Sequence, residues 1–164
     1  MKYGAARGLA NVTFAVYQLT QQNVLSNDPI HPGESVQTGE IRSRGVEISE
    51  EARVNDSLAI TATYSHASTL VTKAGVAFGP EVGMTPSGLP KDLASVWVSY
   101  VVRGSRAAGL GLAGGVRVLG SSWGDDTNSF EVPEATLVDL ALSYVFGAAA
   151  STGASAWRAA LNVS

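Results

Sequence analysis

The sequence predicts an all-β fold in which about seven antiparallel, up-and-down strands form a segment of a transmembrane β-barrel. Three observations favour it: apolar and polar residues alternate with period two, the face opposite the apolar one carries few charges, and the connections alternate between short and long. No segment shows a convincing helical period, and no run approaches the roughly 18 apolar residues that a membrane-spanning helix needs. We therefore expect one β-domain over residues 1–164.

Alternation is clearest in the segment LAITATYS, residues 58–65. Leu58 and Ile60 fall on one face of an extended chain, and Thr61 and Thr63 fall on the other. The same rule predicts strands at residues 94–102, 110–118, 138–144 and 157–163, and two less regular strands precede them at about residues 9–25 and 35–53.

The face opposite the apolar one, called the minor face below, distinguishes a membrane barrel from a soluble sandwich or a lipocalin-like barrel. Apolar and polar residues alternate along the strands of all three folds. A soluble sheet usually carries Lys and Glu on its outer face. Here that face holds Thr, Ser, Gly and Ala, with isolated charges at Arg117, Asp139 and Arg158, and only 15% of all residues are charged. These residues are typical of a barrel lumen.

Aromatic residues lie near the ends of the apolar rows. Tyr64, Tyr100 and Tyr144 each stand at or near the end of a row, and Trp157 begins one. This placement suits the aromatic girdles at the two membrane interfaces. The alternative is that the tyrosines border the core of a soluble fold.

The connections differ in length in a regular way. The expected loops are medium at residues 26–34, tight at 54–57, long at 69–91, short at 104–107, long and acidic at 123–134, and small and flexible at 147–155. Outer-membrane barrels join their strands by short periplasmic turns and long external loops. We therefore expect the first strand to start on the periplasmic side and the last to end at the outer surface.

Several function classes are excluded or disfavoured. A net charge of −3 offers no basic patch for nucleic acid, and zero cysteines with two histidines leave no thiolate or histidine-rich metal site. The sequence GLGLAG from Gly109 to Gly114 matches a dinucleotide fingerprint, but the chain continues to alternate where a helix is required. A triad of His66 with Ser65 and an aspartate has no nucleophile elbow, and residues 125–128 lack calcium-loop spacing. We expect no enzyme, and no catalytic, cofactor-binding or metal residues.

Three stretches resemble the C-terminal half of TonB-dependent siderophore receptors. The first is NVTFAVYQLTQQNVLSNDP, residues 11–29, followed by SVQTGEIRSRGVEI, residues 35–48; the second is GLGLAGGVRVLGSSWGDDTNSFEVP, residues 109–133; the third is TLVDLALSYVFG, residues 136–147, followed by WRAALNVS, residues 157–164. The resemblance implies part of a 22-stranded barrel that encloses an N-terminal plug and imports ferric siderophores with energy from TonB.

What the resemblance implies for this chain is a passive wall in the outer membrane of a Gram-negative bacterium. Its partners would be a ferric siderophore, outer-membrane lipid and, only through a plug that this sequence lacks, the TonB complex. In such a barrel Arg117, Asp139 and Arg158 could pair with the plug or with neighbouring strands, and the loops at residues 69–91 and 123–134 could approach the ligand. The alternative for each is a solvated or locally paired polar group without ligand contact, and the sequence favours this alternative.

The sequence departs from the family pattern, because it shows no plug region, TonB box or signal sequence. We therefore expect a fragment that is insoluble on its own. Two alternatives stay open: a small closed barrel, lipocalin-like or porin-like, that binds or passes a small ligand, and a surface adhesin or structural β-domain. Seven strands disfavour the closed barrel, because small bacterial membrane barrels have an even number of strands.

Overall fold

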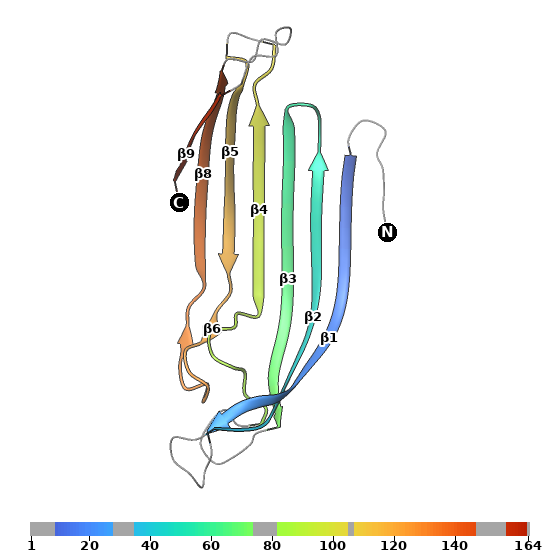
Figure 1. Ribbon diagram of the computed structural model, residues 1–164, viewed down its shortest axis with the longest axis vertical. Coiled ribbons are helices and arrows are strands. Elements are labelled where there is room, and N and C mark those ends of the chain that lie inside the picture. The colour runs from blue at the N-terminus through green and yellow to red at the C-terminus, as the bar shows by residue number, and fades with distance from the viewer. Residues whose placement is uncertain (1–8, 28–34, 74–81, 105–106, 147–156, 164) are drawn as a thin grey trace.

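The computed structural model describes residues 9–27, 35–73, 82–104, 107–146 and 157–163. Within these ranges the chain forms one antiparallel seven-stranded sheet in the order β1-β2-β3-β4-β5-β8-β9, so each strand lies beside its sequence neighbour in the sheet (Figure 1). A separate two-stranded hairpin, β6 with β7, lies at one end. This up-and-down topology confirms the all-β fold class and the seven strands expected from the sequence.

The strand bounds show where the expected elements extend or shift. The strands are β1 (Leu9–Asn27), β2 (Ser35–Arg53), β3 (Leu58–Lys73), β4 (Asp92–Val101), β5 (Leu110–Leu119), β6 (Ser122–Trp123), β7 (Glu131–Val132), β8 (Ala135–Phe146) and β9 (Trp157–Val163). The expected start of the long loop at residue 69 is wrong, because the polar residues up to Lys73 still pair with β2. The expected loop at residues 123–134 contains the β6–β7 pair.

Strand length divides the sheet into two parts. β4 and β5 have 10 residues each and β8 has 12, close to the roughly 9–11 that cross a bilayer at a tilt. β1, β2 and β3 have 19, 19 and 16 residues, and they continue past the others at the lower end of Figure 1. This extension of β1, β2 and β3 lies beyond the apolar part of the sheet and carries polar groups such as Arg44. The Arg44 Nε donates a hydrogen bond to Gln18 Oε1 at 2.7 Å.

The register aligns the apolar residues of every strand on one face. One continuous row contains Ala52, Ile60, Val98, Gly114, Leu140 and Val163, each directly opposite the next. The neighbouring row on the other face contains Glu51, Thr61, Trp97, Gly115 and Asp139. Because a slip of one residue would exchange the two faces, this register fixes which side chains lie on the apolar face and which lie on the opposite one.

Two strand glycines lie under aromatic rings of the neighbouring strand. A Cβ at Gly45 would come within 2.6 Å of the Tyr17 hydroxyl, and a Cβ at Gly115 would collide with the Trp97 ring. Such pairs of glycine and cross-strand aromatic allow a sheet to curve while the ring covers the exposed backbone. β5 runs from Leu110 through the rest of GLGLAG to Leu119, which confirms that Gly111 and Gly114 are small residues within a strand. Gly109 lies just before β5, with a φ of +93°.

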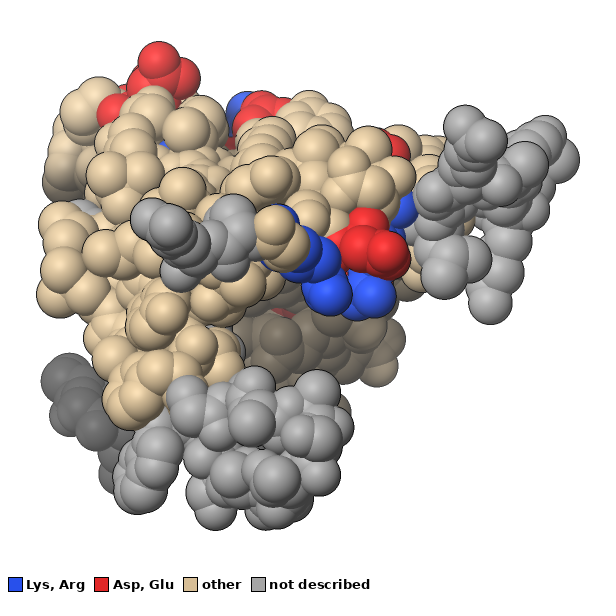
Figure 2. Space-filling view, turned by 90° about the horizontal axis from the view of Figure 1, so that it is seen from above, with Lys and Arg blue, Asp and Glu red and all other residues tan. Residues whose placement is uncertain are grey.

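The two ends of the sheet differ. At one end Asn55 closes the β2–β3 turn by accepting hydrogen bonds from the amides of Ser57 and Leu58, at 2.8 and 2.9 Å. Figure 2 looks onto this end, where charged residues occupy scattered patches among uncharged ones. The long connections lie at the other end. The expected loops at residues 26–34 and 104–107 are described only in part, and the one at 147–155 lies outside the described residues.

Candidate functional site: the inner wall and the outer loops

None of the described residues forms a layer over the apolar face of the sheet. Phe14 is 66% exposed and Leu140 is 60% exposed, and they belong to a set of large apolar residues that are at least a third exposed on every long strand. Val71 is the single buried hydrophobic residue among those described. A water-soluble domain rarely exposes a continuous apolar surface of this extent, so the surface requires an apolar medium.

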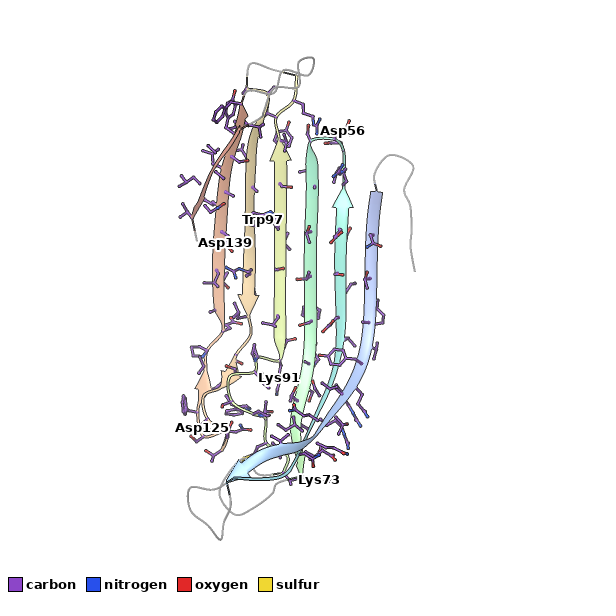
Figure 3. The ribbon with its side chains drawn as sticks, viewed as in Figure 1. Asp56, Lys73, Lys91, Trp97, Asp125 and Asp139 are labelled. Carbon is purple, nitrogen blue, oxygen red and sulfur yellow. The ribbon has the colours of Figure 1, made fainter. Side chains whose placement is uncertain are left out.

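The opposite face carries the polar groups, and its best-defined contact is an ion pair between β5 and β8. Arg117 Nε donates to Asp139 Oδ2 at 2.9 Å, and Nη2 donates to Oδ1 at 3.2 Å. The two residues are diagonal neighbours, since Arg117 is opposite Leu137. Figure 3 labels Asp139 and Trp97, which lie in the same row of this face on either side of Gly115. Both charges therefore have a neighbouring-strand partner, one of the two expected outcomes; the Arg158 side chain is outside the described residues.

Two carboxylates on the inner face of β2 have no such partner. Glu47 lies between Ala15 and Ser65, and Glu51 lies between Asn11 and Thr61. Neither makes an ion pair within the described part of the chain. Sequence reasoning singled out Arg117, Asp139 and Arg158 as charges of the minor face and missed Glu47. The alternation of Glu47 with Val46 and Ile48 could have identified it, because this alternation places Glu47 on the same face.

His66 does meet an aspartate, but in a setting that excludes a catalytic triad. His66 Nδ1 lies 2.8 Å from Asp92 Oδ1, and the Tyr64 hydroxyl donates to the same oxygen at 2.7 Å. These three residues share the apolar face, whereas Ser65 points to the opposite face because successive strand residues alternate. The cluster is a polar end to the apolar rows, which fits the girdle position expected for Tyr64.

Tyr100 and Tyr144 lie at the turn end of the apolar face, and the rings of Tyr144 and Phe146 stack at 6.3 Å. Their position on this face agrees with the sequence prediction. The Trp157 side chain is outside the described residues.

The outer hairpin, residues 122–132, is organised by Asp125. Its carboxylate accepts hydrogen bonds from the Ser129 amide at 2.8 Å, from the Ser129 hydroxyl and from the Thr127 hydroxyl at 3.0 Å. Phe130 packs over Gly124, whose amide donates to the Phe130 carbonyl at 3.0 Å. Residues 125–128 thus form a self-capped loop. Within the described ranges, no group of three or more His, Asp or Glu residues is placed to hold a metal ion.

The hairpin is expected to resist acid until the Asp125 carboxylate is protonated. The hydrogen bonds from Ser129 and then Thr127 hold the pKa of Asp125 below its ordinary value of 3.8. Since the folded pKa is the lower one, the stabilisation is complete above pH 3.8 and is lost as the pH falls through the lowered value. Hydrogen exchange of the Ser129 amide, corrected for its intrinsic pH dependence, should show loss of protection only below pH 3.8; a midpoint above that value would contradict this.

Gly115 is expected to be irreplaceable on the inner face. A methyl group there would collide with the Trp97 indole and approach the Val96 carbonyl oxygen to 2.7 Å, so Gly115→Ala should destabilise the barrel by about 1–3 kcal/mol. Gly114→Ala is the matched control, because its new Cβ would meet the flexible end of Leu140 at 3.1 Å. Denaturant unfolding in detergent, followed by tryptophan fluorescence, measures both variants; equal stability of the two would contradict the account.

No helix within the described ranges is long and apolar enough to cross a membrane.

Comparison with known proteins places these features in a family. The chain matches the family model described as TonB dependent receptor-like, beta-barrel, over residues 1–164. It is 40% identical over 133 residues to the ferrichrome outer membrane transporter/phage receptor of Escherichia coli K12, covering 81% of this chain and 17% of that protein. It is 31% identical over 157 residues to the ferrioxamine B receptor of Salmonella typhimurium, covering 95% of this chain and 22% of that protein.

Solved structures share the fold. BauA, the ferric preacinetobactin receptor of Acinetobacter baumannii, superimposes with a TM-score of 0.68 at 22% identity, covering 84% of this chain and 22% of that chain. The siderophore receptor PiuA of the same species gives a TM-score of 0.66 at 23% identity, over 82% of this chain and 20% of that chain. The chain thus spans about a fifth of the length of these relatives, and it belongs to the β-barrel family of the TonB-dependent receptors.

Proposed function

We propose that this chain forms part of the barrel wall of an outer-membrane receptor that imports ferric siderophores. The observation that carries the proposal is the two-sided sheet: an uncovered apolar face and a polar inner face in the same register across all seven strands. The relatives add the ligand class, because those named are receptors for ferrichrome and ferrioxamine B. The wall itself makes and breaks no bond.

The parity of the strands supports a larger barrel. β1 and β9 run in the same direction because five strands lie between them in an antiparallel sheet. Two copies of the sheet placed edge to edge would therefore meet as parallel strands. An all-antiparallel barrel closes around this sheet only if an odd number of further strands is supplied, and fifteen would complete the 22 strands of a plugged transporter. For the same reason the seven described strands cannot close by themselves into a small all-antiparallel barrel.

The inner face supplies contacts for whatever fills the lumen. Glu47 and Glu51 present two carboxylates that are without ion pairs within the described ranges, while Arg117 and Asp139 neutralise each other. Burial of an unpaired carboxylate against a plug would be costly. We therefore propose that the plug surface facing β2 carries basic groups, and that energy from TonB reaches the receptor through that plug.

The long connections would lie outside the cell and take part in ligand capture. They are at the end opposite the tight β2–β3 turn, and outer-membrane barrels carry their longer loops externally. The parts of these loops that the structure describes are residues 82–91 and the outer hairpin, which holds Asp125 (Figure 3). They form the candidate ligand-contacting surface of this chain.

Uptake of radioactive iron tests the proposal. The complete receptor containing these strands would be expressed in cells that lack their own siderophore receptors and supplied with iron-55 bound to ferrichrome, ferrioxamine B or a catecholate siderophore. Uptake of at least one complex, abolished when TonB is deleted, is expected. A receptor that reaches the outer membrane in folded form but takes up none of the three, or takes them up without TonB, would overturn the proposal.

A further inference from the structure

The two outer loops of this chain are joined by hydrogen bonds from side chain to backbone. The Asn128 side chain of the outer hairpin makes a two-point contact with Thr85: its Oδ1 accepts from the Thr85 amide at 2.9 Å, and its Nδ2 donates to the Thr85 carbonyl at 2.7 Å. Thr85 and Asn128 are 43 residues apart in sequence, and Thr85 is among the few buried residues described. The Asn128 side-chain amide thus bonds to both backbone groups of Thr85, as a paired residue of a neighbouring strand would. Thr85 belongs to the β3–β4 loop, which here means residues 82–91.

Two further bonds continue this contact along the β3–β4 loop. The Ser87 amide donates to Asp126 Oδ1 at 2.9 Å, and the Gly88 amide donates to the Trp123 carbonyl at 2.8 Å. Three amides of the loop therefore depend on the outer hairpin for their acceptors. Because Thr85 is buried, its amide needs such a partner, and the loop conformation at Thr85 requires the hairpin to be in place. Ser87 and Gly88 are exposed, and their bonds extend the contact.

The other side of the β3–β4 loop is attached to the barrel wall. The Gly83 amide donates to the Val71 carbonyl and the Val71 amide donates to the Met84 carbonyl, both at 2.9 Å, and the Ala67 amide donates to the Lys91 carbonyl at 2.8 Å. The loop therefore lies between the extension of β3 and the outer hairpin. A continuous series of hydrogen bonds leads from β3 through the loop to the hairpin, beyond the ends of the shorter strands β4 and β5.

The conformation of Asn128 fits this role. Its φ is +53°, in the left-handed region that Asn tolerates better than most residues, and its own amide donates to the Asp125 carbonyl at 3.2 Å. Because Asp125 in turn fixes Ser129, the side chain of Asn128 is aimed at Thr85 by a loop that is itself closed. The bonds within the hairpin therefore hold the backbone that carries the Asn128 side chain.

We infer that the β3–β4 loop and the outer hairpin act as a single ligand-contacting unit, and that Asn128 is the positioning residue that holds them together. The unit presents apolar side chains from both loops, Val82 and Leu89 from one and Phe130 and Val132 from the other, and all four are at least 44% exposed. This inference rests on the proposed function for the identity of the ligand, but the coupling of the loops does not depend on it.

Hydrogen exchange on the complete receptor in detergent, without ligand, tests the coupling. Asn128→Gly removes the amide and keeps a residue that accepts positive φ, so it avoids backbone strain. Exchange of the Thr85, Ser87 and Gly88 amides should accelerate together by about tenfold, corresponding to about 1.4 kcal/mol, within the range for loss of a hydrogen bond, while amides of the β3–β4 ladder stay protected. Thr127→Ala, which removes a contact inside the hairpin only, should leave all three unchanged. Acceleration at Thr85 alone would overturn the single unit.

Ligand binding tests the positioning role. With whichever of ferrichrome and ferrioxamine B the unaltered receptor binds, Asn128→Gly should weaken binding about tenfold and Asn128→Asp, which keeps the acceptor for the Thr85 amide, should lose less. Unchanged affinity in Asn128→Gly, despite faster exchange in both loops, would overturn the positioning role. If the unaltered receptor binds neither probe, the proposed ligand class fails for these two compounds, and the exchange result still decides whether the loops are one unit.

Discussion

Leu140→Arg is expected to destabilise the barrel by about 2–4 kcal/mol, because it places a charge on the lipid-facing row near the middle of β8. Leu140 stands opposite Gly114 on one side and Val163 on the other, within a row of apolar residues. A guanidinium at that depth must either draw water into the hydrocarbon or bend toward the membrane interface, and both cost free energy. Denaturant unfolding of the complete receptor in lipid vesicles measures the difference.

The adjacent residue provides the matched control. Ala141 lies on the inner face, opposite Ala113 and Asn162, so Ala141→Arg introduces the same side chain into the lumen. Its cost should be less than about half that of Leu140→Arg, because the lumen is polar and hydrated. If Ala141→Arg destabilises the barrel as much as Leu140→Arg does, the assignment of the two faces is wrong.

Residues 1–164 produced alone in aqueous buffer are expected to aggregate. Within the part of the chain that the structure describes, the sheet ends at β1 and β9, each with one unpaired edge, and its apolar face is uncovered. Unpaired edges and large apolar surfaces both promote association in water. Size-exclusion chromatography with light scattering should find aggregates without detergent and dispersed protein with it.

The fragment prediction has a clear contrary result. A monodisperse, soluble monomer in plain buffer would show that the apolar face is covered by the chain itself, for example by a conformation in which the sheet folds over. The barrel assignment would then be abandoned for this chain. Family membership alone does not establish how this chain folds when produced by itself, since it spans only about a fifth of the length of its relatives.

Most of the wall could be predicted from the sequence, because alternation with period two is a local property. Spacing alone predicts the apolar faces of the strands that contain Leu58, Val98 and Leu142. The register confirms that these residues lie on the same face of the sheet. The tight turn around Asn55 was also predicted, since Asn caps such turns with its own side chain. The C-terminal end of β3 was missed because Ser68, Thr69 and Thr72 resemble loop residues.

The contacts that join elements distant in sequence could not be predicted. Nothing local in the sequence distinguishes Asn128 from Thr127 or Ser129, and only the folded chain brings Asn128 to Thr85. The pairing of Arg117 with Asp139 similarly depends on the diagonal offset of β5 and β8. The Arg117 side chain is 53% exposed. The ion pair is therefore expected to contribute at most about 1 kcal/mol to the stability of the sheet.

The medium in contact with the apolar rows can be measured directly by spin labelling. The sequence contains no cysteine, so single cysteines can be placed in turn at positions 138–144 of the complete receptor, provided that any cysteines elsewhere in it are removed. Accessibility to oxygen, which concentrates in hydrocarbon, should be high at Val138, Leu140, Leu142 and Tyr144, and low at the three positions between them. If the four positions are instead shielded from both oxygen and a water-soluble relaxation agent, those side chains are packed inside protein and the account of a membrane-spanning wall is wrong.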